Sequence, residues 1–134
     1  YEVAWVGDSR AYLWQDGTLA QLSQDHSYVQ TLVDEGTLTP EQARSRPHRN
    51  VVTQALGVTD PNHLNVSMTA GELRPGMQLL LCSDGLTEEV EDARIADTLG
   101  GLDCSAQDCV DTPAAETYAG CRPDALTIFL ARCQ

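Results

Sequence analysis

The stretch Met77-Gln78-Leu79-Leu80-Leu81-Cys82, followed at once by Ser83-Asp84-Gly85, decides the fold class of this 134-residue chain. A short and nearly continuous apolar run is typical of a strand that is covered on both faces. The polar triplet after it ends the run abruptly and indicates a turn. The sequence therefore predicts a buried strand at residues 77–82, with Asp84 just beyond its end.

Strands and helices alternate in blocks on either side of this strand. Upstream, we expect a meander of three strands at residues 3–6, 10–14 and 18–22, with a turn at residues 7–9. The next expected elements are helices at 26–35 and from the capping sequence at 39–42, then a strand at 63–68. The last are helices at 92–99 and within 105–119, and a strand at 126–131. This order predicts a single α+β domain of layered sheets and helices.

The charge of the chain excludes one class of partner and favours another. Asp and Glu number 20 against 8 Lys plus Arg, and Lys is absent, so we expect no nucleic-acid partner. The apolar runs fall far short of the ~20 residues that span a bilayer, so we expect no membrane partner. Carboxylates are hard oxygen ligands, and an acidic chain is suited to bind Mg²⁺ or Mn²⁺.

The five cysteines are expected to be free thiols. They are Cys82, Cys104, Cys109, Cys121 and Cys133. Their odd number, and the lack of an apolar signal segment before them, argue against a disulfide framework, and their spacing does not match common zinc sites. Free thiols indicate a reducing compartment, which predicts a cytoplasmic protein.

Three aspartates lie beside the ends of predicted strands: Asp8, Asp84 and Asp124. Strand ends that converge at one edge of a sheet can present carboxylates to a common ion. Asp also favours turns through hydrogen bonds to its own backbone, so each of the three also fits a turn. Position alone permits a metal site without requiring one.

Five segments of the chain, in order, resemble those of the PPM family, the metal-dependent PP2C-type protein serine/threonine phosphatases. They are VGDSRAY at residues 6–12, LSQDHS at 22–27, NVVTQALG at 50–57, LLCSDGLT at 80–87 and PDALT at 123–127. The resemblance, closest to bacterial members, implies an α-β-β-α sandwich of two antiparallel sheets flanked by helices. It covers about the second half of a family domain, so residues 1–134 are expected to be its C-terminal portion.

The resemblance also implies a reaction, a cofactor and a substrate. The reaction is hydrolysis of phosphoserine or phosphothreonine in a protein, the substrate of a bacterial Ser/Thr kinase, by a water that Mn²⁺ or Mg²⁺ activates. By the resemblance, Asp84 and Asp124 ligate one of two core ions, and Asp8 with Asp84 holds a third, weaker ion. Arg10 is expected to brace its loop by pairing with a carboxylate.

Residues 26–56 resemble the family's flap, a segment beside the catalytic cleft that influences substrate choice. This segment carries Arg44, Arg46, His48 and Arg49. These cations can attract a phosphorylated, acidic peptide, or they can be solvated charges on a helix end and loop. The sequence leaves both interpretations open.

The chain departs from the family pattern in two ways. Ala125 follows Asp124 where the family has Asn, so the hydrogen bonds of that amide are lost near a predicted metal ligand. The phosphate-binding Arg, an acidic residue and the metal-bridging Asp of the family's first half have no counterpart, which leaves the catalytic residues unassigned. We therefore expect the chain to be inactive alone, and to need its N-terminal half or another copy of itself to cover the strand at residues 3–6.

Two other classes of protein are alternatives to the enzyme. A non-catalytic PP2C-like regulatory or binding module that has lost its metal centre is favoured by Ala125, whereas the retention of Asp8, Asp84 and Asp124 favours the enzyme. An acidic calcium-binding protein is disfavoured, because the sequence contains no D-x-D-x-D-G loop.

Overall fold

The computed structural model describes residues 1–101 and the strand at 128–132. Within this part the chain forms strands β1 Glu2–Trp5, β2 Arg10–Gln15, β3 Thr18–Gln21, β4 Ser67–Ala70, β5 Gln78–Cys82 and β6 Ile128–Arg132. The helices are α1 Tyr28–Asp34, α2 Pro40–Arg44, α3 Asp84–Thr87 and α4 Asp92–Gly101. The predicted helices within 105–119 lie outside the described residues.

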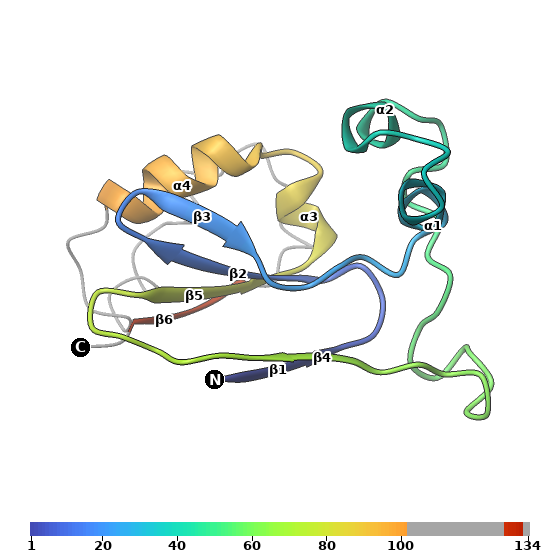
Figure 1. The fold of residues 1–134 in the computed structure, drawn as a ribbon, viewed down its shortest axis with the longest axis horizontal. Coiled ribbons are helices and arrows are strands. Elements are labelled where there is room, and N and C mark those ends of the chain that lie inside the picture. Colours follow the sequence, from blue (N-terminus) through green and yellow to red (C-terminus); the bar gives the residue numbers. More distant parts are fainter. Residues whose placement is uncertain (102–127, 133–134) are drawn as a thin grey trace.

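The described strands form two antiparallel sheets, of four strands in the order β3-β2-β5-β6 and of two strands, β1 and β4. Figure 1 shows helices α3 and α4 above the larger sheet and the β1–β4 pair below it. This arrangement of antiparallel sheets and helices confirms the predicted α+β class. After β1 the chain forms β2 and β3 of the larger sheet. It then passes through α1 and α2 and returns to the smaller sheet as β4.

The predicted three-strand meander is wrong, because β1 does not pair with β2. Strand β1 pairs instead with β4, with Glu2 opposite Ala70 and Trp5 opposite Ser67. Gly7 between β1 and β2 has φ +102, a conformation that side-chain-bearing residues rarely adopt. The turn at Gly7 separates the two strands into different sheets, whereas β2 and β3 do form the expected hairpin.

Local sequence signals explain the turns and caps. Asp16 and Gly17 both have positive φ, as the two-residue type I′ turn between β2 and β3 requires. Ser27 caps α1 by accepting a hydrogen bond from the Gln30 amide, and Thr39 with Gln42 forms a capping box on α2. The predicted cap at Thr39 is therefore confirmed, whereas α1 begins at Tyr28, two residues after its predicted start.

The core lies between the larger sheet and helices α3 and α4. It consists of Tyr12, Leu80, Cys82, Leu86, Ile95 and Leu99. Strand β5 is an interior strand of the sheet, as its apolar run predicts, but only alternate residues are fully buried, and Leu79 and Leu81 are half-buried. We expected β5 to be covered on both faces. Within the described structure, one face of β5 is buried and the other is only partly covered.

Strand β5 ends at Cys82, as predicted, and residues 83–85 then begin helix α3, with Ser83 at its N-cap position. The strand predicted at 63–68 begins only at Ser67, because the Asp60 carboxylate accepts a hydrogen bond from the Asn62 amide and turns the chain there. None of the described helices has the length and apolar character needed to cross a membrane.

Candidate active site

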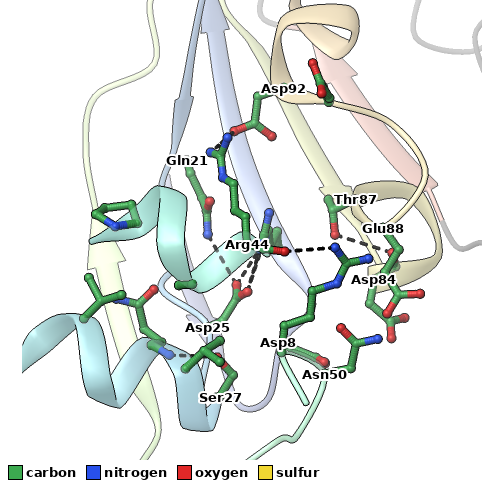
Figure 2. A pocket seen from close by; sticks show the side chains of 18 of the residues that line it. Asp8, Gln21, Asp25, Ser27, Arg44, Asn50, Asp84, Thr87, Glu88 and Asp92 are labelled. Atoms are coloured by element: carbon green, nitrogen blue, oxygen red, sulfur yellow. Dashed lines mark hydrogen bonds and ion pairs between the residues drawn. The ribbon is translucent and has the colours of Figure 1, made fainter. Parts of the chain in front are cut away.

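An acidic cleft of about 490 Å³ lies between the flap and one end of the larger sheet. Its carboxylates are Asp8, Asp25, Asp84, Glu88, Glu89, Glu91 and Asp92, and its arginines are Arg10, Arg44 and Arg49. Figure 2 shows the side chain of Arg44 extending toward Asp92, and Asp84 and Glu88 on the α3 side of the cleft. The cleft therefore combines carboxylates beside one end of the larger sheet with two arginines of the flap.

The strand register brings two of the three predicted metal ligands together. Strands β2 and β5 are antiparallel, with Arg10 opposite Cys82. Asp8 lies two residues before Arg10, and Asp84 lies two residues after Cys82, so both emerge at the same end of the sheet. Burial raises the pKa of the Asp8 carboxyl above its usual range, and the negative charge of Asp84 raises it further.

These two carboxylates suit a divalent cation but do not complete a site for one. A cation between them would offset both the burial and the repulsion that disfavour the charged form of Asp8. In residues 1–101 and 128–132, however, no three His, Cys, Asp or Glu side chains gather closely enough to hold a metal. Strand β6 begins opposite Cys82, at this end of the sheet, but Asp124 itself lies outside the described residues. The described residues thus bring two carboxylates together and add no third metal-binding side chain to them.

Arg10 braces the entrance to β2, as predicted. Its Nε and Nη2 atoms donate to the two carboxylate oxygens of Asp25 at 2.9 and 2.7 Å, and Nη1 donates to the Tyr12 hydroxyl at 3.1 Å. Burial opposes the Arg10 charge, but Asp25 outweighs it and raises the pKa of the guanidinium. The Tyr12 hydroxyl in turn donates to Asp92 at 3.1 Å, which ties the start of α4 to the sheet. Because it is committed to Asp25, Arg10 is poorly placed to bind a substrate.

The flap cations fall into two groups. Arg44 and Arg49 line the cleft, whereas Arg46 and His48 do not. The Arg44 guanidinium lies 3.7 Å from the Asp92 carboxylate, and Arg49 donates at 3.1 Å to the backbone carbonyl of Arg44. Arg44 and Asp92 are both well exposed, so their attraction is screened by water and holds the flap only weakly.

Sequence reasoning missed several residues that build the cleft. Two of them lie in the LSQDHS segment: Asp25, which pairs with Arg10, and His26, which contacts Gly7. The resemblance of this segment to the family pointed to both residues but gave neither a role. The acidic rim on the α3 side comes from the run Glu88-Glu89-Val90-Glu91-Asp92. That run was visible as a cluster of charges, but only the fold places it at the cleft.

Several bacterial phosphatases are similar to this chain in sequence and in fold. The family model described as protein phosphatase 2C matches residues 1–32. The serine/threonine protein phosphatase PstP of Mycobacterium tuberculosis is 46% identical over 94 residues, which cover 70% of this chain and 18% of PstP. The serine/threonine phosphatase Stp of Listeria welshimeri is 37% identical over 129 residues, covering 96% of this chain and 50% of Stp. The chain resembles the PP2C family in both sequence and fold.

Solved structures of bacterial serine/threonine phosphatases are similar to this chain over nearly its full length. The crystal structure of PstP/Ppp from M. tuberculosis matches with a TM-score of 0.78 and 37% identity, covering 99% of this chain and 55% of the other. A PstP catalytic domain in complex with two manganese ions matches with a TM-score of 0.66 and 33% identity. The chain thus spans about half or less of the PP2C-type proteins that it matches.

Proposed function

We propose that residues 1–134 form the C-terminal portion of a PP2C-type domain that, when complete, hydrolyses phosphoserine and phosphothreonine in proteins. The observation that carries this proposal is the placement of Asp8 and Asp84 at one sheet end, inside the cleft that the flap borders. Relatives named serine/threonine phosphatases support the class of reaction.

The cofactor that fits the cleft is Mn²⁺ or Mg²⁺, which prefer carboxylate oxygens. Asp84 with Asp124 would hold a core ion, and Asp8 with Asp84 would hold a weaker one. When bound, such ions supply an activated water and neutralise phosphoryl oxygens. The manganese complex of PstP supports this choice, and the Arg10–Asp25 pair would keep the strand that follows Asp8 in place.

The flap would recruit the substrate through charge. Arg44 and Arg49 face the cleft, and the third arginine among the described residues that line it, Arg10, already pairs with Asp25. An acidic phosphopeptide can be drawn to these two side chains and held across the acidic cleft. Arg46 and His48 lie between these two in the sequence but do not line the cleft, so they would contact the peptide away from its phosphoryl group. The natural substrate would be a phosphoprotein of a bacterial Ser/Thr kinase.

A second candidate is a non-catalytic PP2C-like binding module. It is favoured by the lack of a three-ligand cluster within the described residues, together with Ala125 after Asp124. This candidate predicts a cleft that binds phosphopeptide but releases no phosphate.

The two candidates can be separated by measuring phosphate release from a phosphoserine peptide. The assay uses the complete protein that contains this chain, in the presence of Mn²⁺. For the enzyme, Asp84→Asn lowers kcat/KM by about 100-fold or more, because an amide oxygen is a poorer ligand than a carboxylate. Asp97→Asn, on the exposed side of α4 and outside the cleft, is the matched control and stays within about twofold of the wild type. Normal turnover in the Asp84 variant contradicts the proposal, and a wild type that binds but never releases phosphate favours the module.

The cytoplasmic location remains a proposal that thiol labelling tests. Burial raises the pKa of the Cys82 thiol to about 12, so Cys82 should resist labelling in the folded protein. After denaturation without reductant, all five cysteines of residues 1–134 should react as free thiols. A consistent deficit of two would reveal a disulfide and argue against a reducing compartment.

A further inference from the structure

His26 joins three parts of the molecule at the root of the flap. Its Nδ1 accepts a hydrogen bond from the Gly7 amide at 3.1 Å, and its own amide donates to the Gly7 carbonyl at 2.9 Å. Its Nε2 lies 2.9 Å from the hydroxyl of Ser67 on β4. At the far end of the flap, the Thr53 amide donates to the His26 carbonyl at 2.8 Å. Both polar groups of the Gly7 backbone are therefore bound by one residue.

These contacts require one tautomer of the His26 ring. A backbone N–H can only donate, so Nδ1 must present its lone pair to Gly7 and carry no proton. The ring proton then lies on Nε2, which donates to the Ser67 hydroxyl. The Ser67 contact thus keeps Nδ1 in the form that Gly7 needs.

The orientation of the ring is held from its face as well. Trp5 stacks on His26 with ring centroids 6.3 Å apart and an interplanar angle of 26°. The Trp5 indole is itself fixed, because its Nε1 donates to the Gln24 carbonyl at 2.8 Å. An imidazole held at its face and at both nitrogens gives the Gly7 turn a rigid anchor.

The residue after this anchored glycine is Asp8, whose carboxylate lines the acidic cleft beside Asp84. The proposed metal role of Asp8 needs its carboxylate to stay there despite burial and the negative charge of Asp84, which both disfavour it. We propose that His26 is a positioning residue, which holds the Gly7 turn through Nδ1 and so sets the Asp8 carboxylate for divalent-cation binding. This inference rests on the proposed function, because it takes Asp8 to be a metal ligand.

The test compares variants of the complete protein by titrating Mn²⁺ and following free Mn²⁺ by electron paramagnetic resonance. His26→Leu removes both ring contacts and should raise the half-saturating Mn²⁺ concentration about tenfold or more, the range typical of residues that orient a ligand. His26→Asn retains an oxygen near the position of Nδ1 and should stay within about threefold of the wild type. Ser67→Ala leaves Nδ1 able to accept and should have a smaller effect than His26→Leu.

Hydrogen exchange of the Gly7 amide, followed by NMR, gives a readout independent of the metal. This amide should lose protection in His26→Leu and keep it in His26→Asn. If His26→Leu does not fold, His26→Gln supplies the same comparison, because its longer amide reaches toward Ser67 and not toward Gly7. Melting temperatures measured without metal identify any variant whose weaker Mn²⁺ binding follows from general instability.

Unchanged Mn²⁺ binding in His26→Leu would overturn the proposal, as would equal losses in His26→Leu and His26→Asn. Asp8→Asn separates this failure from that of the proposed function. If Asp8→Asn weakens Mn²⁺ binding and His26→Leu does not, only the role of His26 is wrong. If Asp8→Asn leaves binding unchanged, Asp8 is not a ligand, and both the positioning role and the third-ion assignment fail.

Discussion

The four-stranded sheet and the flap are held in different ways. In the sheet, β2 and β5 lie between neighbouring strands, and neither Tyr12 of β2 nor Leu86 of the covering helix α3 has exposed surface. In the flap, α1 buries no residue and α2 buries only Ala43. Figure 1 shows α1 and α2 standing apart from the sheets, beyond the end where α3 begins.

This difference matches two different tasks in the proposed phosphatase. Metal ligands need fixed positions, and Asp8 and Asp84 lie two residues beyond the paired ends of β2 and β5. A flap that buries few side chains can adjust to different peptides at low cost. Hydrogen bonds at the Ser27–Val52 bridge and the weak Arg44–Asp92 pair limit its movement.

The largest expected effect comes from truncating one leucine in each region. Leu86 is fully buried in the core, and Leu38 in the flap is 8% exposed. We expect Leu86→Ala to lower the free energy of unfolding by about 3–4 kcal/mol, within the usual range for a buried leucine. Leu38→Ala should cost about 1 kcal/mol globally, because a weakly attached flap can open without unfolding the sheet. Urea denaturation measures both, and equal losses would contradict the comparison.

A smaller effect is expected from the flap cations that line the cleft. Arg44→Ala combined with Arg49→Ala should lower kcat/KM for an acidic phosphopeptide by about 3- to 10-fold, as expected for partly screened charges. Hydrolysis of p-nitrophenyl phosphate should stay within about twofold, because this small substrate does not reach along the flap. Arg94→Ala on α4 is the control outside the cleft. Arg46→Ala should show a weaker effect than the double variant if facing the cleft is what matters.

The smallest effect concerns the stability cost of Asp8. Its carboxyl has a pKa raised above the ordinary value of 3.8, so the ionised form is disfavoured in the folded state. This cost is present at pH 7 and disappears as the pH falls below 3.8, where the carboxyl is protonated in both states. Asp8→Asn should therefore raise the melting temperature by a few degrees at pH 7 without metal, and the gain should vanish in acid. A gain that persists unchanged at low pH would show a cause other than charge.

Local structure was predictable from the sequence wherever short-range chemistry decides it. The helix cap at Thr39 and the Asp16-Gly17 turn follow from residues a few positions apart. The partner of β1 was not predictable in this way, because β4 lies more than 60 residues along the chain. The same limit applies to the site, since the Asp25 and His26 contacts depend on how two distant turns meet.

The predicted roles of Asp8 and Asp84 came from the resemblance to a known family and not from the hydrophobic periodicity of the sequence. From position alone, Asp8 and Asp84 fit ordinary turn residues better than metal ligands. The β2–β5 register then placed both at one sheet end, which raises their value as ligand candidates without completing the set. Asp124, Ala125 and four of the cysteines lie outside the described residues, and the assignments made for them stay predictions.

The central claim is that carboxylates fixed by the sheet carry the chemistry, whereas the flap only captures the substrate. The most direct test compares kcat/KM for p-nitrophenyl phosphate, in Mn²⁺, between Asp84→Asn and the Arg44→Ala/Arg49→Ala variant of the complete protein. We predict a loss of about 100-fold or more for the first and less than about twofold for the second. Equal losses in the two variants, or no loss in Asp84→Asn, would contradict this division between the sheet and the flap.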